Sequence, residues 1–144
     1  MSKPSQTEHD AYWSRYSDLV SEDDIVGAME REAEATSKML AGISEEKGRF
    51  RYAPDKWTIK DLVTHVADTE RILNYRALSI ARGDTRSLLG FEEKEFAAHA
   101  ETDRRPLRDI AAAWADVREA TIGMFRDFSE TAWSRAVQCS GARR

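Results

Sequence analysis

The sequence of 144 residues has one cysteine, few glycines and prolines, and no long apolar run. Cys139 alone cannot form an internal disulfide, so packing must stabilise the fold. No stretch approaches the roughly 20 apolar residues of a membrane span, and the polar start over residues 1–10 differs from a signal peptide. We therefore expect a cytoplasmic protein that makes no contact with membranes.

The chain also lacks an excess of positive charge. It carries 22 lysines and arginines against 26 aspartates and glutamates, for a net charge of −4. Binding to nucleic-acid phosphates requires a clustered basic surface, so we expect no nucleic-acid partner. The hydrophobic share of 41% is sufficient for a core, and the length suits one domain.

The composition favours helices over strands. Alanine occurs 20 times, whereas valine and isoleucine together occur 13 times and glycine and proline together 10 times. The sequence therefore predicts one all-α domain over residues 1–144. Within it we expect an N-terminal arm over residues 1–20 and an irregular tail over residues 134–144.

Capping patterns and apolar periodicity predict three long helices. Residues 21–24 are typical of a helix N-terminus, and this first helix should end near Gly42. Thr58 opens a second helix, which contains no glycine or proline through Arg82. A third, strongly amphipathic helix begins at Pro106. The second helix carries its predicted core-facing residues at helical spacing, namely Leu62, Val66, Thr69, Ile72, Leu73, Ala77 and Ile80.

Two connections join these helices. Residues 45–56 break the helical period, and we expect Phe50 and Tyr52 within them to pack inward. The 23 residues over 84–106 are long for a simple hairpin between bundle neighbours and allow a crossover, with a short helix over residues 91–99.

His65 lies on the predicted apolar face of the second helix and is the leading candidate for a metal ligand. A buried histidine in such a position either bonds a neighbour in the core or ligates a metal. An ion with an open position for water requires about three protein ligands, and the chain offers only His9, His65 and His99. Glu95 and His99 could share a turn, but their surroundings suggest a solvated face, and His9 belongs to the arm.

Other reactive residues have structural explanations. Asp68 comes near the histidine's face of the second helix, whereas Glu70 points away from it. For both carboxylates we expect helix-surface salt bridges to Arg71 or Lys60. We expect the thiol of Cys139, in the tail, to be incidental. The sequence contains no phosphate loop, nucleophile elbow or Cys-x-x-Cys pair, so no organic cofactor is expected.

Residues 57–71 resemble the signature of the DinB/YfiT-like superfamily. The segment starts with Trp57-Thr58, and His65 follows eight residues after the tryptophan, as is typical of that family. The resemblance covers nearly the whole chain. Further segments that look like one DinB branch are residues 50–56, 75–77, 81–84 and 114–125.

The resemblance implies a four-helix bundle of up-and-down helices with a long crossover, often a dimer. It also implies a divalent metal, zinc or nickel, held by one histidine on the second helix and two on the last. His65 matches the first of these ligands. Relatives include transferases that act on low-molecular-weight thiols and electrophiles, and a metal-bound thiolate suits this chemistry because the cation lowers the thiol pKa.

The chain departs from the family after Trp133, where the last helix with its two histidines is missing or replaced by a short tail. We therefore expect negligible metal affinity and no activity, unless Asp68, His99 or a second chain completes the site. The function implied is a metal-binding, thiol-dependent S-transferase or a related hydrolase. The alternative is a non-catalytic helical bundle or interaction module that dimerises through an uncovered apolar stripe. The sequence assigns no catalytic residue.

Overall fold

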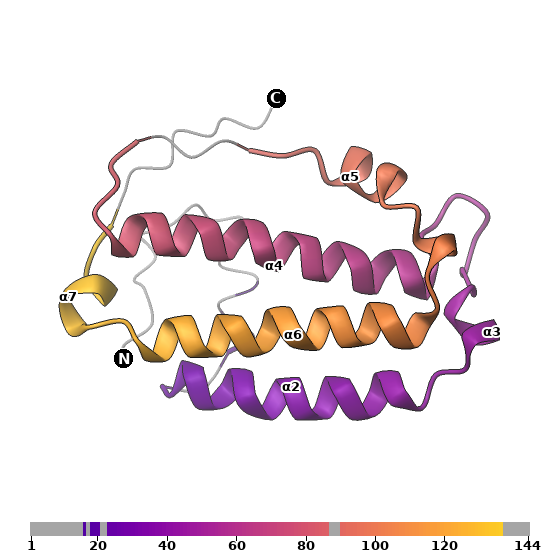
Figure 1. Cartoon of the computed structure of the whole chain (residues 1–144), viewed down its shortest axis with the longest axis horizontal. Coiled ribbons are helices and arrows are strands. Elements are labelled where there is room, and N and C mark those ends of the chain that lie inside the picture. The colour runs from indigo at the N-terminus through magenta and orange to yellow at the C-terminus, as the bar shows by residue number, and fades with distance from the viewer. Residues whose placement is uncertain (1–15, 17, 21–22, 87–89, 137–144) are drawn as a thin grey trace.

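Three long helices form the body of the molecule. The computed structural model describes residues 16, 18–20, 23–86 and 90–136. Its long helices are α2 (Ile25–Ala41), α4 (Ile59–Ala81) and α6 (Leu107–Arg126), and its short ones are α3 (Glu45–Gly48), α5 (Glu93–His99), η1 (Thr102–Arg104) and α7 (Glu130–Trp133). Helix α6 lies between α2 and α4 (Figure 1). No strand occurs in these residues, so the all-α prediction is confirmed for them.

Local caps set where the long helices begin. The hydroxyl of Thr58 accepts a hydrogen bond from the amide of Asp61 at 3.1 Å, and the Asp61 carboxylate accepts one from the amide of Thr58 at 2.9 Å. Asp24 caps α2 by accepting from the amide of Gly27 at 3.0 Å. The predicted starts of the second and third long helices are confirmed to within a residue, whereas the first begins at Ile25, just after the predicted start over residues 21–24. Of the first predicted start, residues 21 and 22 lie outside the described part of the chain.

Helices α4 and α6 run parallel. Near the start of α4, Lys60 donates a hydrogen bond to the carbonyl of Arg105, just before α6, at 2.8 Å. Further along, Asn74 donates to the hydroxyl of Thr121 at 2.6 Å. The connection between the two helices returns along the length of the molecule and carries α5 (Figure 1). The crossover that the sequence allows is thus present. Helix α2 runs antiparallel to both (Figure 1).

The buried core lies where α2 ends and α4 and α6 begin. It consists of Leu40 from α2, Val63 and Ala67 from α4, and Ile110 and Trp114 from α6. Ala67 is 3% exposed and Trp114 is 4% exposed, so the packing of the three helices encloses both side chains. This packing fixes the first half of α4, which carries His65.

The predicted core face of α4 is only partly buried, and this expectation is wrong for Leu62, Val66 and Leu73, which are exposed. Leu62 is 50% exposed and Leu73 is 43% exposed, whereas Val63 and Ala67 are buried. The reason is that α6 is the long helix that packs along α4 in the described residues. It covers the face of α4 that carries Val63 and Ala67, and this face is rotated by about one residue from the predicted apolar stripe. The stripe around Leu62 and Leu73 therefore lies open on the surface.

The prediction that Phe50 and Tyr52 pack inward is also wrong. Phe50 is 59% exposed and Tyr52 is 76% exposed. The segment before them contacts α6 through Gly48, where an added Cβ atom would lie 3.1 Å from the side chain of Leu107. The absence of a side chain at Gly48 allows this close approach to Leu107, whereas the aromatic side chains that follow lie on the surface.

A buried lysine joins three elements at this end of the bundle. Lys60 is 1% exposed, and its ammonium group forms an ion pair with Glu45 of α3 besides its bond to the carbonyl of Arg105. The Glu45 carboxylate also accepts a hydrogen bond from the amide of Leu107 at 2.6 Å. The hydrogen bond from Lys60, followed by that from Leu107, lowers the pKa of Glu45 below its ordinary value.

Replacing Glu45 should change the dependence of stability on pH. A lowered pKa in the folded state stabilises the protein above the ordinary value of 4.5, and this stabilisation is lost as the pH falls through the lower folded-state pKa. We expect Glu45→Gln to unfold more easily than the parent at pH 7 and to lose less stability on acidification to pH 3.5. Urea unfolding at several pH values measures both effects. Glu46→Gln, an exposed neighbour, serves as the control, and parallel pH profiles for the parent and Glu45→Gln would contradict the assignment.

Candidate functional site

His65 lies in the second turn of α4 and is half-buried. Its imidazole packs against the indole of Trp57, with the ring centroids 4.6 Å apart and the planes at 47°. Trp57 directly precedes the N-cap residue of α4, so the capping geometry of Thr58 positions both rings. The histidine therefore lies at the edge of the open apolar stripe and is not enclosed in the core.

The carboxylates nearest to His65 along the helix are already engaged. Asp61 accepts hydrogen bonds from the Thr58 amide and the Thr102 hydroxyl. Burial raises the pKa of Asp61, but these hydrogen bonds lower it by more, so the group stays ionised. One turn after the histidine, Asp68 forms an ion pair with Arg71 at 2.8 Å, which confirms the expected salt bridge on the helix surface.

The remaining sequence candidates do not gather around His65. The Nδ1 atom of His99 lies 2.7 Å from the carbonyl oxygen of Glu95 within α5, and both side chains are exposed. His9 and Cys139 fall outside the described residues. Within the described part of the chain, no three His, Cys, Asp or Glu residues are grouped so that they could hold a metal ion.

Glu70 belongs to a polar cluster between α4 and α6, which corrects the expectation of a bridge to Arg71 or Lys60. Its side chain is 11% exposed. One carboxylate oxygen accepts from the Thr121 hydroxyl at 2.5 Å, and the other lies 3.0 Å from the Arg118 guanidinium. Glu70 lies five residues after His65, so its side chain points away from the histidine. It points toward α6 and not toward solvent.

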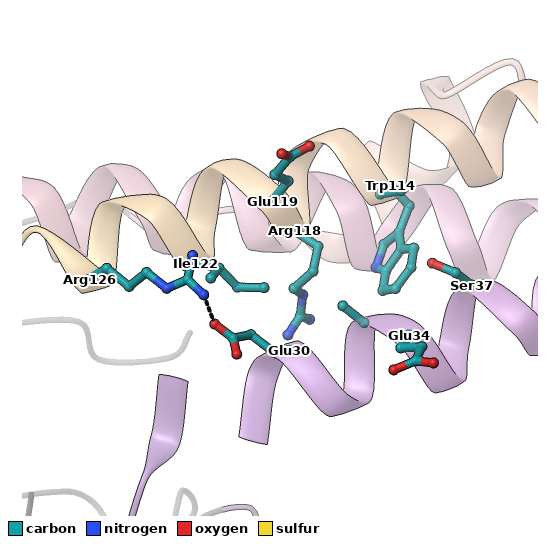
Figure 2. A pocket seen from close by; sticks show the side chains of 10 residues that line it. Glu30, Glu34, Ser37, Trp114, Arg118, Glu119, Ile122 and Arg126 are labelled. Atoms are coloured by element: carbon teal, nitrogen blue, oxygen red, sulfur yellow. Dashed lines mark hydrogen bonds and ion pairs between the residues drawn. The ribbon is translucent and has the colours of Figure 1, made fainter. Parts of the chain in front are cut away.

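A cavity of about 340 Å³ opens beside this cluster, between α2 and α6 (Figure 2). The guanidinium of Arg118 lies 5.8 Å from the ring centroid of Trp114, and Arg126 forms an ion pair with Glu30 at the rim. Both arginines therefore have carboxylate partners within the protein. A sequence signal for this cluster exists, because Arg118 and Thr121 interrupt the apolar face of the third predicted helix.

A larger cavity, of about 780 Å³, lies at the start of α4. Its apolar wall consists of Phe50, Tyr52, Trp57, Ile59 and Leu62. Trp57 thus lines this cavity and also packs against His65. Sequence reasoning missed the cavity because it placed two of these aromatic side chains in the core.

Comparisons with known proteins identify the family. Residues 28–142 match the DinB superfamily. The chain belongs to this superfamily. YfiT from Bacillus subtilis, described as a probable metal-dependent hydrolase with an unusual four-helix bundle topology, has a DinB-like structure that matches with a TM-score of 0.67 at 16% sequence identity. The match covers 80% of this chain and 66% of YfiT, so the chain spans about two thirds of the length of YfiT. Among curated proteins, none matches.

The DinB fold of this chain is that of the four-helix bundle, with three of its long helices in the described residues. Part of the tail expected over residues 134–144 and most of the arm expected over residues 1–20 lie outside those residues. No helix among the described residues is both long and apolar enough to cross a membrane.

The DinB resemblance implies a divalent metal, but the residues around His65 do not by themselves fit one. A metal site with an open position requires about three protein ligands. The structure provides one imidazole there, while Asp61 and Asp68 are held by other partners. The described residues of this DinB chain therefore supply at most one part of a metal site.

Breaking the partly buried Glu70–Arg118 ion pair should cost more stability than breaking the more exposed Glu30–Arg126 pair. Arg118→Met leaves the Glu70 carboxylate without its cation in a mostly buried place, and we expect a loss of about 2 kcal/mol in the free energy of unfolding. Arg126→Met removes the exposed pair with Glu30 and should cost less than about 1 kcal/mol. Urea unfolding measures both, and Glu70→Gln should recover part of the loss when combined with Arg118→Met. Equal losses for the two arginine variants would contradict this ranking.

Proposed function

We propose that this protein is a divalent-metal-binding member of the DinB superfamily that acts on a small molecule. In this proposal His65 is one ligand, and a second copy of the chain completes the site. The observation that carries it is the position of His65, at the histidine of the family signature and against Trp57 beside a large cavity. The description of YfiT, which has the same bundle topology, as a probable metal-dependent hydrolase supports it.

The open apolar stripe of α4 supports the homodimer. Leu62, Val66 and Leu73 are all substantially exposed and lie on the same side of the helix as His65. Large exposed apolar patches seldom persist on soluble monomers, and a two-fold axis pairs the same patch on both copies. Such a pairing would bring the same surface of a second copy, with its own His65, toward each His65. The same stripe favours the alternative function, a non-catalytic module that dimerises without metal.

The small molecule is a thiol or an electrophile if the reaction is the S-transfer that the resemblance implies. It is a hydrolysable substrate if the reaction is like the one in the description of YfiT. Assays of purified protein with added zinc or nickel, in the presence and absence of a low-molecular-weight thiol, distinguish the two reactions.

Removing the imidazole of His65 should abolish metal binding. We expect purified parent protein to hold close to one zinc or nickel ion per chain or per dimer by elemental analysis. His65→Gln should hold less than about a tenth of this amount, because a neutral amide is a poor ligand for these ions. His99→Gln is the matched control and should retain the metal, since the exposed His99 side chain contacts the carbonyl of Glu95 in α5.

Two results would contradict the metal proposal. One is a parent protein without metal after purification and after reconstitution with either ion. The other is full metal content in His65→Gln. A stable dimer without metal would support the non-catalytic alternative.

Charges placed on the open stripe should separate the dimer. We expect Val66→Glu combined with Leu73→Glu to shift the mass measured by light scattering from dimer to monomer and to weaken association at least about tenfold. Both side chains are exposed, so the fold should survive, as circular dichroism would verify. Met39→Glu, at an exposed apolar residue of α2, is the control and should leave the dimer intact. A parent protein that is monomeric at all concentrations would contradict the dimer.

A further inference from the structure

The 780 Å³ cavity at the start of α4 has the size of a small-molecule site. Its wall combines three aromatic side chains, Phe50, Tyr52 and Trp57, with the aliphatic side chains of Ile59 and Leu62. Phe50 and Tyr52 are among the most exposed large apolar side chains of the described residues. Flat apolar groups stack favourably against such rings, so this wall suits an aromatic or other planar ligand.

The same cavity has a strong local excess of positive charge. Four cations line it, namely Lys47, Arg51, Lys56 and Lys94, against the single carboxylate of Asp55. Asp55 pairs with Lys56 at 3.1 Å, and Arg51 donates to the carbonyl of Pro54 at 3.4 Å. Lys47 and Lys94 form no ion pair within the described part of the chain. This excess stands against a net charge of −4 for the whole chain.

The cavity between α2 and α6 shows that such an excess is not general in this protein. There, Arg118 pairs with Glu70 and Arg126 pairs with Glu30, so both cations of the cavity are neutralised internally. At the start of α4, by contrast, two lysines have no partner of opposite charge in the described residues. Their charge is available to a ligand.

We propose that the cavity at the start of α4 binds a small organic anion with a flat aromatic body, such as an aromatic carboxylate, phosphate or sulfonate. The aromatic wall holds the ring, and Lys47 and Lys94 hold the anionic group. A cationic ligand is excluded, because four positive side chains would repel it even though the rings could attract it. Trp57 lines the cavity and packs against His65. The ligand class is therefore also the substrate class of the proposed function, and this part of the inference rests on that function.

The test uses 1-anilinonaphthalene-8-sulfonate, an aromatic sulfonate whose fluorescence rises on binding. It is titrated into the full chain in buffer with a chelator, so that no metal contributes. We expect Lys47→Gln combined with Lys94→Gln to weaken binding about tenfold, and 0.5 M sodium chloride to weaken binding to the parent similarly. The control, Lys38→Gln combined with Arg82→Gln, removes two exposed positive charges outside the cavity and should leave the affinity unchanged.

Competition distinguishes recognition of the anion from mere affinity for an apolar surface. We expect 1-naphthoate to displace the dye at least about tenfold more effectively than 1-naphthylmethanol, which has the same ring system and no charge. Tyr52→Ala should weaken both the dye and the naphthoate while the lysines remain in place. Equal affinities of the parent and the double lysine variant, or equal competition by the two naphthalene compounds, would overturn the proposal.

The outcome is independent of the metal experiment. Dye binding is measured in chelator, whereas metal content is measured without a ligand and depends on His65. Loss of anion selectivity with metal content intact would overturn only the assignment of the cavity. Selective anion binding by a chain without metal would support the cavity and contradict the metal proposal.

Discussion

The buried ammonium group of Lys60 constrains the end of the bundle at which the candidate site lies. A charge removed from water requires close partners of opposite charge or carbonyl dipoles. Here the partners are the Glu45 carboxylate and the Arg105 carbonyl, which come from α3 and from the residue pair that precedes α6. Three segments must therefore meet around one side chain of α4. Helix α3 in turn precedes the loop that carries Phe50, Tyr52 and Trp57, and Trp57 packs against His65.

The helices follow from local signals, whereas the buried face of α4 does not. The reciprocal hydrogen bonds of Thr58 and Asp61 involve residues three apart, so the sequence alone predicts where α4 begins. The apolar period of the same helix identifies a hydrophobic stripe but not the neighbour that covers it. In the structure α6 packs on Val63 and Ala67, and Leu62 and Leu73 stay open. That choice depends on the placement of a helix more than 40 residues later in the chain.

The sequence predicts only part of the candidate site, because the rest depends on packing between distant segments. His65 stands out because its spacing from Trp57 matches a family signature, and the contact of the two rings is a consequence of the helix cap. The cavity beside them is lined by the loop before α4, by the start of α4 and by Lys94 of α5, and this meeting of distant segments carries no local pattern. The pairing of Glu70 with Arg118 is likewise a product of helix packing, because the polar interruption of the α6 face at Arg118 does not identify its partner on α4.

The crossover between α4 and α6 has an electrical consequence. In a hairpin of two helices the peptide dipoles oppose each other, but the parallel pair here adds them, and both amino-terminal poles lie at the same end of the molecule (Figure 1). Helix α2 runs antiparallel to both, so its negative carboxyl-terminal pole lies at this end and offsets only one of the two positive poles. Asp61 and Glu45, which accept hydrogen bonds from backbone amides at the starts of α4 and α6, place negative charge at these poles. The chain connectivity thus contributes to the sign of the field at the end where the candidate site lies, independently of which side chains line its cavity.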